Sequence, residues 1–203
     1  MTENMRVLVA CEFSGVVRNA FEKQGHYAMS CDLLPTEIPG NHYQGDVRDV
    51  LYDDWDLLIA HPPCTRLCRQ SQRWVESHEE VLDAVDLFCE LRDAPIQKIC
   101  IENPIPFRSV RELLGEYTQI VQPWQFGHDF SKRTGFWLKN LPKLKPTNIV
   151  QITYYVTPKG RKFTNGWYHT PRNSIDRSRT FTGIADAMAT QWTNIDDGLD
   201  SWI

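Results

Sequence analysis

The 203-residue sequence has no apolar run close to the roughly 20 residues that cross a bilayer. Its first residues are polar and lead directly into a strand-like run, so we expect neither a secretory signal nor a membrane span. Six cysteines are too few for a disulfide scaffold, and we expect them to be reduced in a cytoplasmic protein. The 41% of hydrophobic residues excludes disorder of the whole chain, and the length fits one domain with at most a small appendage.

Acidic side chains are almost missing from residues 131–180. This window holds eleven lysines and arginines against one acid, Asp176, whereas the rest of the chain has eleven basic and 25 acidic residues. Such asymmetry indicates an anionic partner, and the aromatic residues Phe163, Trp167 and Tyr168 among the charges suit DNA or a nucleotide. The alternative is a solvated basic surface that binds nothing.

Strand-like and helix-like segments alternate through residue 122. Short runs rich in apolar and β-branched residues predict strands over 6–11, 27–31, 55–60 and 98–101, with later strands over 118–121 and 135–138. Helical spacing of apolar residues predicts helices over 16–23, 76–92 and 183–192. This alternation predicts an α/β fold with a mostly parallel, Rossmann-like sheet and helices on both faces.

Residues 139–180 lack clear periodicity and carry four prolines. We therefore divide the chain into a core of residues 1–138, a small basic, loop-rich insert of residues 139–177 and a C-terminal helical segment of residues 178–203.

Polar residues gather where the predicted strands end. They are Glu12 to Gly15, Asp32, Asp46, His61 to Thr65, and Glu102 with Asn103. In parallel sheets ligands bind beyond the carboxyl ends of the strands. The sequence therefore predicts an active site at this edge of the sheet.

The turn after the first predicted strand has one glycine, Gly15, where a dinucleotide-binding fingerprint has three. Asp32 follows close to the offset of about 20 residues at which an acid binds ribose hydroxyls. The plainer alternatives are an ordinary strand-to-helix turn for Gly15 and a capping or turn aspartate for Asp32.

The strongest predicted strand ends in His61-Pro62-Pro63-Cys64. Two prolines fix the backbone and present Cys64 rigidly, which makes this thiol a candidate nucleophile. We expect Cys11, Cys31, Cys89 and Cys100 to be small buried residues instead. His61 is either a base or a structural residue, and Cys64 with Cys68 is too weak a pattern to predict a metal site.

Glu102 ends the next strand. Beside a cysteine site, such a carboxyl group could stay protonated or share a proton with a ring nitrogen, and a loop carboxylate is the alternative.

Together these segments resemble the DNA (cytosine-5)-methyltransferases. Cys11 to Gly15 resembles the turn that holds S-adenosylmethionine, Pro63-Cys64 the motif of the nucleophile, and Glu102-Asn103 the motif whose glutamate binds the target cytosine. Lys132-Arg133-Thr134 is similar to the arginine-containing motif, and Gly183 to Ala189 to a last motif, a helix that returns to the cofactor pocket.

The resemblance implies S-adenosyl-L-methionine as cofactor, C5 of cytosine in DNA as acceptor and a covalent bond between the cysteine and C6. It implies catalytic roles for Cys64, Glu102 and Arg133. It implies cofactor contacts from Phe13, Ser14, Gly15, Asp32 on the ribose, Asp46 on the adenine, and Pro63. Substrate contacts would come from Asn103, Arg66, Arg69 and Lys132.

The sequence departs from the family pattern at Val17 and Arg18, where further glycines are usual, and at Thr65, where glutamine is usual. The insert is also far smaller than a typical target-recognition domain, which leaves a free cytosine nucleotide open as the substrate. Small proteins of this type resemble those carried by bacteriophages.

Two other functions remain open. One is a non-catalytic protein of methyltransferase fold that binds nucleic acid. The other is an amino-group methyltransferase, because His61-Pro62-Pro63-Cys64 also resembles the Asn/Asp-Pro-Pro-aromatic motif, although His61 and Cys64 supply neither its acceptor nor its aromatic ring well.

Overall fold

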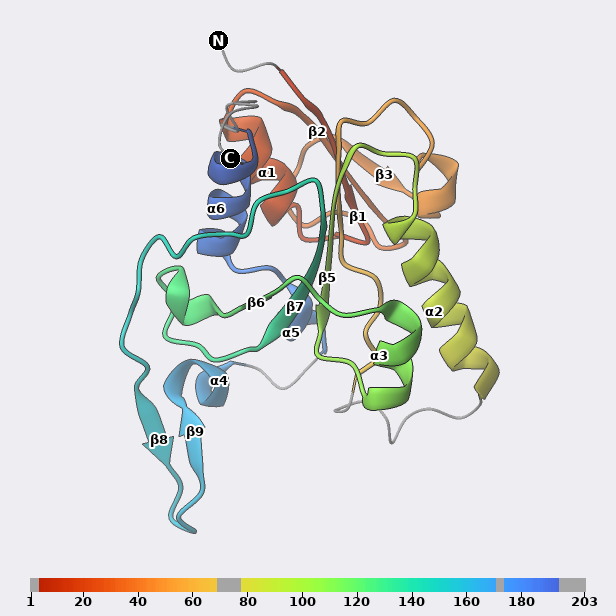
Figure 1. Cartoon of the computed structure of the whole chain (residues 1–203). Coiled ribbons are helices and arrows are strands. Elements are labelled where there is room, and N and C mark those ends of the chain that lie inside the picture. Colours follow the sequence, from red (N-terminus) through yellow and green to blue (C-terminus); the bar gives the residue numbers. More distant parts are fainter. Residues whose placement is uncertain (1–3, 69–77, 171–173, 194–203) are drawn as a thin grey trace, which may run out of the picture.

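The computed structural model describes residues 4–68, 78–170 and 174–193. Its main sheet has seven strands in the order β3-β2-β1-β4-β5-β7-β6 (Figure 1). The strands are β1 (Arg6–Ala10), β2 (Tyr27–Asp32), β3 (His42–Gln44), β4 (Leu57–Ala60), β5 (Lys98–Pro104), β6 (Gln119–Val121) and β7 (Thr134–Lys139). The α-helices are α1 (Val16–Lys23), α2 (His78–Arg92), α3 (Arg108–Leu114), α4 (Asn165–His169), α5 (Ser174–Ser178) and α6 (Thr182–Thr193). Short 3₁₀ helices form at η1 (Val47–Asp49) and η3 (Pro123–Gln125).

Two hydrophobic cores cover the two faces of the sheet. Successive side chains of a strand point to opposite sides, so one strand can contribute to both cores. From β1, Leu8 and Ala10 pack into a core with α2 and α3, whereas Val7 and Val9 pack with α1 and α6. Figure 1 shows α1 and α6 on one face of the sheet and α2 and α3 on the other. The α/β fold predicted from the sequence is confirmed.

The strand order positions the site. The chain runs outward from β1 through β2 to β3 on one side and through β4 to β5 on the other, with all four of these pairings parallel. The loops that follow β1 and β4 therefore diverge, and a parallel sheet leaves a ligand-binding crevice at such a point. Beyond β5, strand β7 lies between β5 and β6 and runs antiparallel to both.

The insert differs from the expected loop. It contains a hairpin of β8 (Tyr154–Val156) and β9 (Lys162–Thr164), followed by α4 and α5, and Figure 1 shows this hairpin extending away from the main sheet. Strands of three residues are too short to show a two-residue period in the sequence, which is why the segment reads as a loop.

Helix α6 is fixed at both ends. A side chain at Gly183 would place its Cβ 2.0 Å from the Phe126 carbonyl oxygen, so only glycine allows this close approach. The Gly183 N–H donates to His128 Nε2 at 3.1 Å, and the fully buried Trp192 donates its indole N–H to the Pro142 carbonyl at 3.0 Å. Within the described residues, no helix is long and apolar enough to cross a membrane.

Candidate active site at the ends of strands β1, β4 and β5

A pocket opens beyond the carboxyl ends of β1 and β4. It is lined by Cys11, Glu12, Phe13, Ser14, His61, Ser178, Arg179 and Thr180. The first turn of the chain and the segment that leads into α6 therefore meet across one cavity. Phe13 and Ser14, predicted as cofactor contacts, lie in its wall, and Gly15 follows them at φ +73°, in the left-handed region that favours glycine.

Glu12 occupies the N-terminus of α1. Its carboxylate accepts hydrogen bonds from the backbone N–H groups of Val17 at 2.7 Å and Arg18 at 3.3 Å, and from the Ser14 hydroxyl. In dinucleotide-binding folds these N–H groups bind the pyrophosphate. Because a buried carboxylate already fills that position, the turn is unsuited to a phosphate and fits a cofactor without one.

Cys64 follows β4 in a segment that is tied to the next strand. The Asn103 side-chain amide, on β5 and almost completely buried, donates to the Pro62 carbonyl at 2.9 Å. The Cys64 carbonyl accepts from the N–H groups of Leu67 and Cys68, which makes a helical turn after the cysteine. The position of the thiol relative to β5 is therefore set by hydrogen bonds from both sides.

The surroundings of Cys64 do not activate its thiol. A hydrogen bond with Cys68 and burial raise the pKa of Cys64, and Lys132 is the nearby charge that opposes this shift. At neutral pH the group is therefore a thiol, and its proton must leave when it acts as a nucleophile.

His61 and Glu102 form a pair across β4 and β5. His61 Nδ1 lies 2.9 Å from Glu102 Oε2, and both side chains are largely buried. Burial alone would lower the pKa of His61 and raise that of Glu102. The attraction between them outweighs burial in both cases, so the pKa of His61 is raised and that of Glu102 is lowered. The lowered pKa of Glu102 disfavours the alternative that its carboxyl group stays protonated, and the sharing of a proton with a ring nitrogen of the substrate stays a prediction.

Lys132, rather than Arg133, is the neighbouring cation that acts electrostatically on these groups. Its charge lowers the pKa values of Cys64, His61 and Glu102 alike, and its ammonium group donates to the Arg177 carbonyl at 3.1 Å. The side chain of Arg133 is exposed. The catalytic role assigned to Arg133 stays a prediction, and Lys132 is the cation that the structure brings to the site.

Arg179 is part of the pocket lining. Its guanidinium group makes two hydrogen bonds to Glu37, at 2.6 and 2.7 Å, pairs with Asp176 and lies 5.9 Å from the centre of the Phe13 ring. The hydrogen bonds from Arg179 lower the pKa of Glu37. The loop after β2 and the segment before α6 are thus joined above the first turn.

The two acids predicted to bind the cofactor make local contacts. Asp32 accepts from the Leu34 N–H at 2.9 Å in a turn, and Asp46 caps η1 by accepting from the Arg48 N–H at 2.9 Å. Neither is part of the pocket lining. Their contacts to a cofactor remain predictions.

Other predicted contacts are spread around Cys64. Pro63 is exposed, and Arg66 pairs with Glu80 of α2 at 3.0 Å. The side chain of Asn103 is buried and binds the Pro62 carbonyl, as described above, so it does not lie on an open surface. Arg69 lies outside the described residues. In the part of the chain that the structure describes, no three His, Cys, Asp or Glu side chains gather in a group that could hold a metal ion.

No protein-family profile matches the chain, and no curated protein sequence matches it. Solved structures do. An E. coli prophage protein described as a DNA modification methyltransferase is 14% identical over 74% of this chain and 53% of its own, with a TM-score of 0.51. This likeness shows that the chain shares the α/β fold of that protein.

Two further structures resemble the chain less closely. The S. pombe Dnmt2 methyltransferase is 18% identical, with a TM-score of 0.46 over 70% of this chain and 51% of its own. The bifunctional kinase-methyltransferase WbdD is 15% identical, with a TM-score of 0.44 over 77% of this chain and 39% of its own. The chain thus spans about half the length of the prophage protein and of Dnmt2.

Several residues of the pocket lining received no individual role from the sequence, among them Cys11, Arg179 and Thr180. Cys11, expected to be a small buried residue, lines the pocket with φ +56°, and burial raises its pKa to about 12. Arg179 and Thr180 come from the other end of the chain, and the Thr180 hydroxyl donates to Glu102 at 3.4 Å. The one sequence signal that places Arg179 and Thr180 near the pocket is the resemblance of residues 183–189 to a helix that returns to the cofactor.

Proposed function

We propose that this protein transfers a methyl group from S-adenosylmethionine to C5 of cytosine in DNA, through a covalent bond between Cys64 Sγ and C6. The observation that carries the proposal is the pairing of two strand ends. Cys64 follows β4 and Glu102 ends the adjacent β5, Asn103 ties these two segments together, and the charge of Lys132 acts on both functional groups.

These groups fit the chemistry of an unreactive carbon. Addition of Cys64 to C6 makes C5 electron-rich enough to take a methyl group from a sulfonium. The adduct carries one proton at N3, which balances the proton lost by the thiol, and the Glu102 carboxylate accepts the N3–H. Loss of the C5 proton, elimination of Cys64 and return of the N3 proton to its sulfur then release 5-methylcytosine.

The cofactor would bind in the pocket between residues 11–14 and 178–180. S-adenosylmethionine has no phosphate, which agrees with the Glu12 carboxylate at the N-terminus of α1. When bound, it supplies an electrophilic methyl group. Phe13, Ser14 and Gly15 would hold it, with Asp32, Asp46 and Pro63 as further contacts.

A suicide substrate tests this proposal directly. DNA that contains 5-fluorocytosine has no C5 proton to lose, so the covalent intermediate cannot break down after methyl transfer. We expect intact-mass measurement of the wild-type protein with S-adenosylmethionine to show an adduct of protein and methylated DNA. Duplex and single strands should be compared, because the target base must leave a duplex stack before it can enter such a site.

Absence of the adduct on every DNA form, together with absence of 5-methylcytosine from ordinary DNA, would contradict the proposal. Methylation of free cytosine nucleotides in the same assay would then identify the alternative substrate. Binding of DNA without either reaction would indicate a non-catalytic protein.

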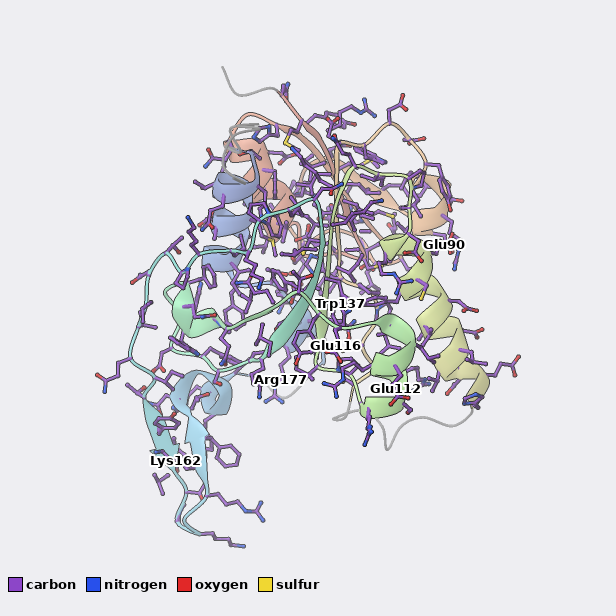
Figure 2. The ribbon with its side chains drawn as sticks, viewed as in Figure 1. Glu90, Glu112, Glu116, Trp137, Lys162 and Arg177 are labelled. Atoms are coloured by element: carbon purple, nitrogen blue, oxygen red, sulfur yellow. The ribbon has the colours of Figure 1, made fainter. Side chains whose placement is uncertain are left out.

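DNA binding would use the basic insert. Lys162 lies 3.9 Å from the centre of the Tyr154 ring, and Tyr155 stacks on Tyr168 at 3.9 Å between ring centres. Figure 2 shows Lys162 on the hairpin that extends from the body of the protein. Residues 140–170 include four lysines and one arginine but no acid, a composition that suits contact with a phosphate backbone.

Charge reversal at the hairpin should weaken DNA binding. Lys159 is exposed in the turn between β8 and β9, and Lys159→Glu should reduce affinity and make the slope of log K against log salt shallower, by about one for each phosphate that is no longer neutralised. Lys23→Glu, an equal charge change on an exposed residue at the far end of α1, is the matched control. Equal effects of both variants in fluorescence anisotropy would show that only net charge matters.

A further inference from the structure

We propose that His61 is a positioning residue that couples the pocket to Glu102: one ring nitrogen holds the Glu102 carboxylate, and the other meets the ligand in the pocket. This inference rests on the proposed function for the role of Glu102, but not for the existence of the pair. The resemblance to the cytosine-5 methyltransferases assigns roles to Pro63 and Cys64 but none to His61.

The first half of the coupling is an ion pair. His61 Nδ1 lies 2.9 Å from Glu102 Oε2, with both side chains about one-eighth exposed. The His61 N–H donates to the Ala10 carbonyl at 2.9 Å, so the residue continues β4 alongside β1, and Glu102 is held in the β5 ladder opposite Phe136. Because both backbones are fixed by sheet hydrogen bonds, the pair has little freedom to separate.

The second half is an orphaned nitrogen. His61 Nε2 is buried and has no hydrogen-bond partner among the described residues, while His61 itself lines the pocket. A buried donor without a partner is costly, and a ligand that brings an acceptor oxygen would satisfy it. S-adenosylmethionine has such oxygens in its carboxylate and ribose.

The surrounding charges favour an imidazolium. Glu102 on β5 and Glu12 after β1 raise the pKa of His61, whereas burial and Lys132 before β7 lower it. Cys11, in the same wall, has its pKa raised to about 12 and adds no charge at neutral pH. Arg179, the remaining charge of the pocket lining, is engaged by Glu37 and Asp176. With His61 protonated, both ring nitrogens are donors, one to Glu102 and one to the pocket.

The coupling predicts a distinctive titration. Histidine NMR of the ¹⁵N-labelled wild type should show His61 with a pKa above the ordinary value. In Glu102→Gln, only the charge of Glu12 still raises the pKa of His61, whereas burial and Lys132 lower it. The pKa of His61 should therefore fall below the ordinary value. S-adenosylhomocysteine should raise it in the wild type. His26, which lies at the opposite end of the sheet and whose pKa burial lowers, is the internal control and should not change.

The same coupling predicts a pH profile for methyl transfer. Activity should be lost as the pH rises through the pKa of His61, because Glu102 then loses its cation. In His61→Gln, whose amide can still donate to Glu102 but does not titrate, this alkaline limb should disappear and the rate at neutral pH should fall about tenfold. A merely structural histidine would leave the shape of the profile unchanged.

Two results would overturn the inference. One is a His61 titration that neither Glu102→Gln nor S-adenosylhomocysteine shifts. The other is a pH profile of His61→Gln that superimposes on that of the wild type. If the wild type methylates no DNA or nucleotide, the proposed function fails, and the NMR titration still decides whether His61 couples the pocket to Glu102.

Discussion

Cys64→Ser abolishes methyl transfer and leaves cofactor binding intact, if the thiol is the nucleophile. Serine keeps the size and the hydrogen bond but is a far weaker nucleophile at neutral pH, so the rate should fall by roughly 10³-fold or more. The adduct with 5-fluorocytosine DNA should vanish as well. Calorimetry with S-adenosylhomocysteine should show an unchanged affinity, because the lining of the pocket does not include Cys64.

Cys89→Ser is the matched control for loss of a thiol. Cys89 lies on α2, partly buried and away from the pocket, and this variant should keep wild-type rates. Methyl transfer by Cys64→Ser at more than a tenth of the wild-type rate would contradict the covalent mechanism. It would favour direct transfer to an amino group instead.

Arg18→Ala should lower the free energy of unfolding by about 3 kcal/mol or more. Arg18 is fully buried on α1, and its guanidinium group donates to Ser30, Thr36, and the carbonyls of Ile38 and Pro39 at 2.5 to 3.3 Å. The loss of three or four hydrogen bonds at about 1 kcal/mol each, together with a cavity, accounts for this magnitude.

The loss should also reach the cofactor. Arg18 fills the space beside Gly15 and Gly40, where an added Cβ would lie 2.7 Å from its Nη2, so it joins the first turn to the loop that follows Asp32. Without Arg18, this loop loses its hydrogen bonds to α1, and affinity for S-adenosylhomocysteine should fall with stability.

Urea unfolding and calorimetry measure both effects. Arg108→Ala, which removes an exposed arginine that pairs with Glu112 on α3, should change the free energy of unfolding by less than about 1 kcal/mol and is the control. Equal losses in the two variants would show that the buried guanidinium group does not organise the loop. The position of Arg18 also explains why the sequence has an arginine where the cytosine-5 methyltransferase pattern usually has a glycine: this side chain fills the space beside Gly15 and Gly40.

Much of the fold was predictable because its signals are local. The apolar runs of β1 and β4 and the spacing of Val17, Ala20 and Phe21 in α1 reflect burial on both faces of a parallel sheet. The main core strands and helices follow from such patterns. The hairpin of the insert did not, because strands of three residues with half-exposed side chains carry no period.

The candidate site was predictable in its position more than in its contacts. Parallel strands end at one edge, so the polar residues after β1, β4 and β5 had to lie near one another. Which of them touch depends on pairs distant in sequence, such as His61 with Glu102 and Arg179 with Glu37.

By itself, the sequence determined the α/β class, the edge of the sheet that carries polar groups and the candidate nucleophile, because periodicity and strand ends are encoded within a few residues. The tertiary structure alone decided that β7 enters between β5 and β6, that the charge of Lys132 acts on the thiol, and that Glu102 receives a histidine partner. These features depend on the distance and burial of groups brought together by folding, and electrostatic interactions are set by distance and burial rather than by position along the chain.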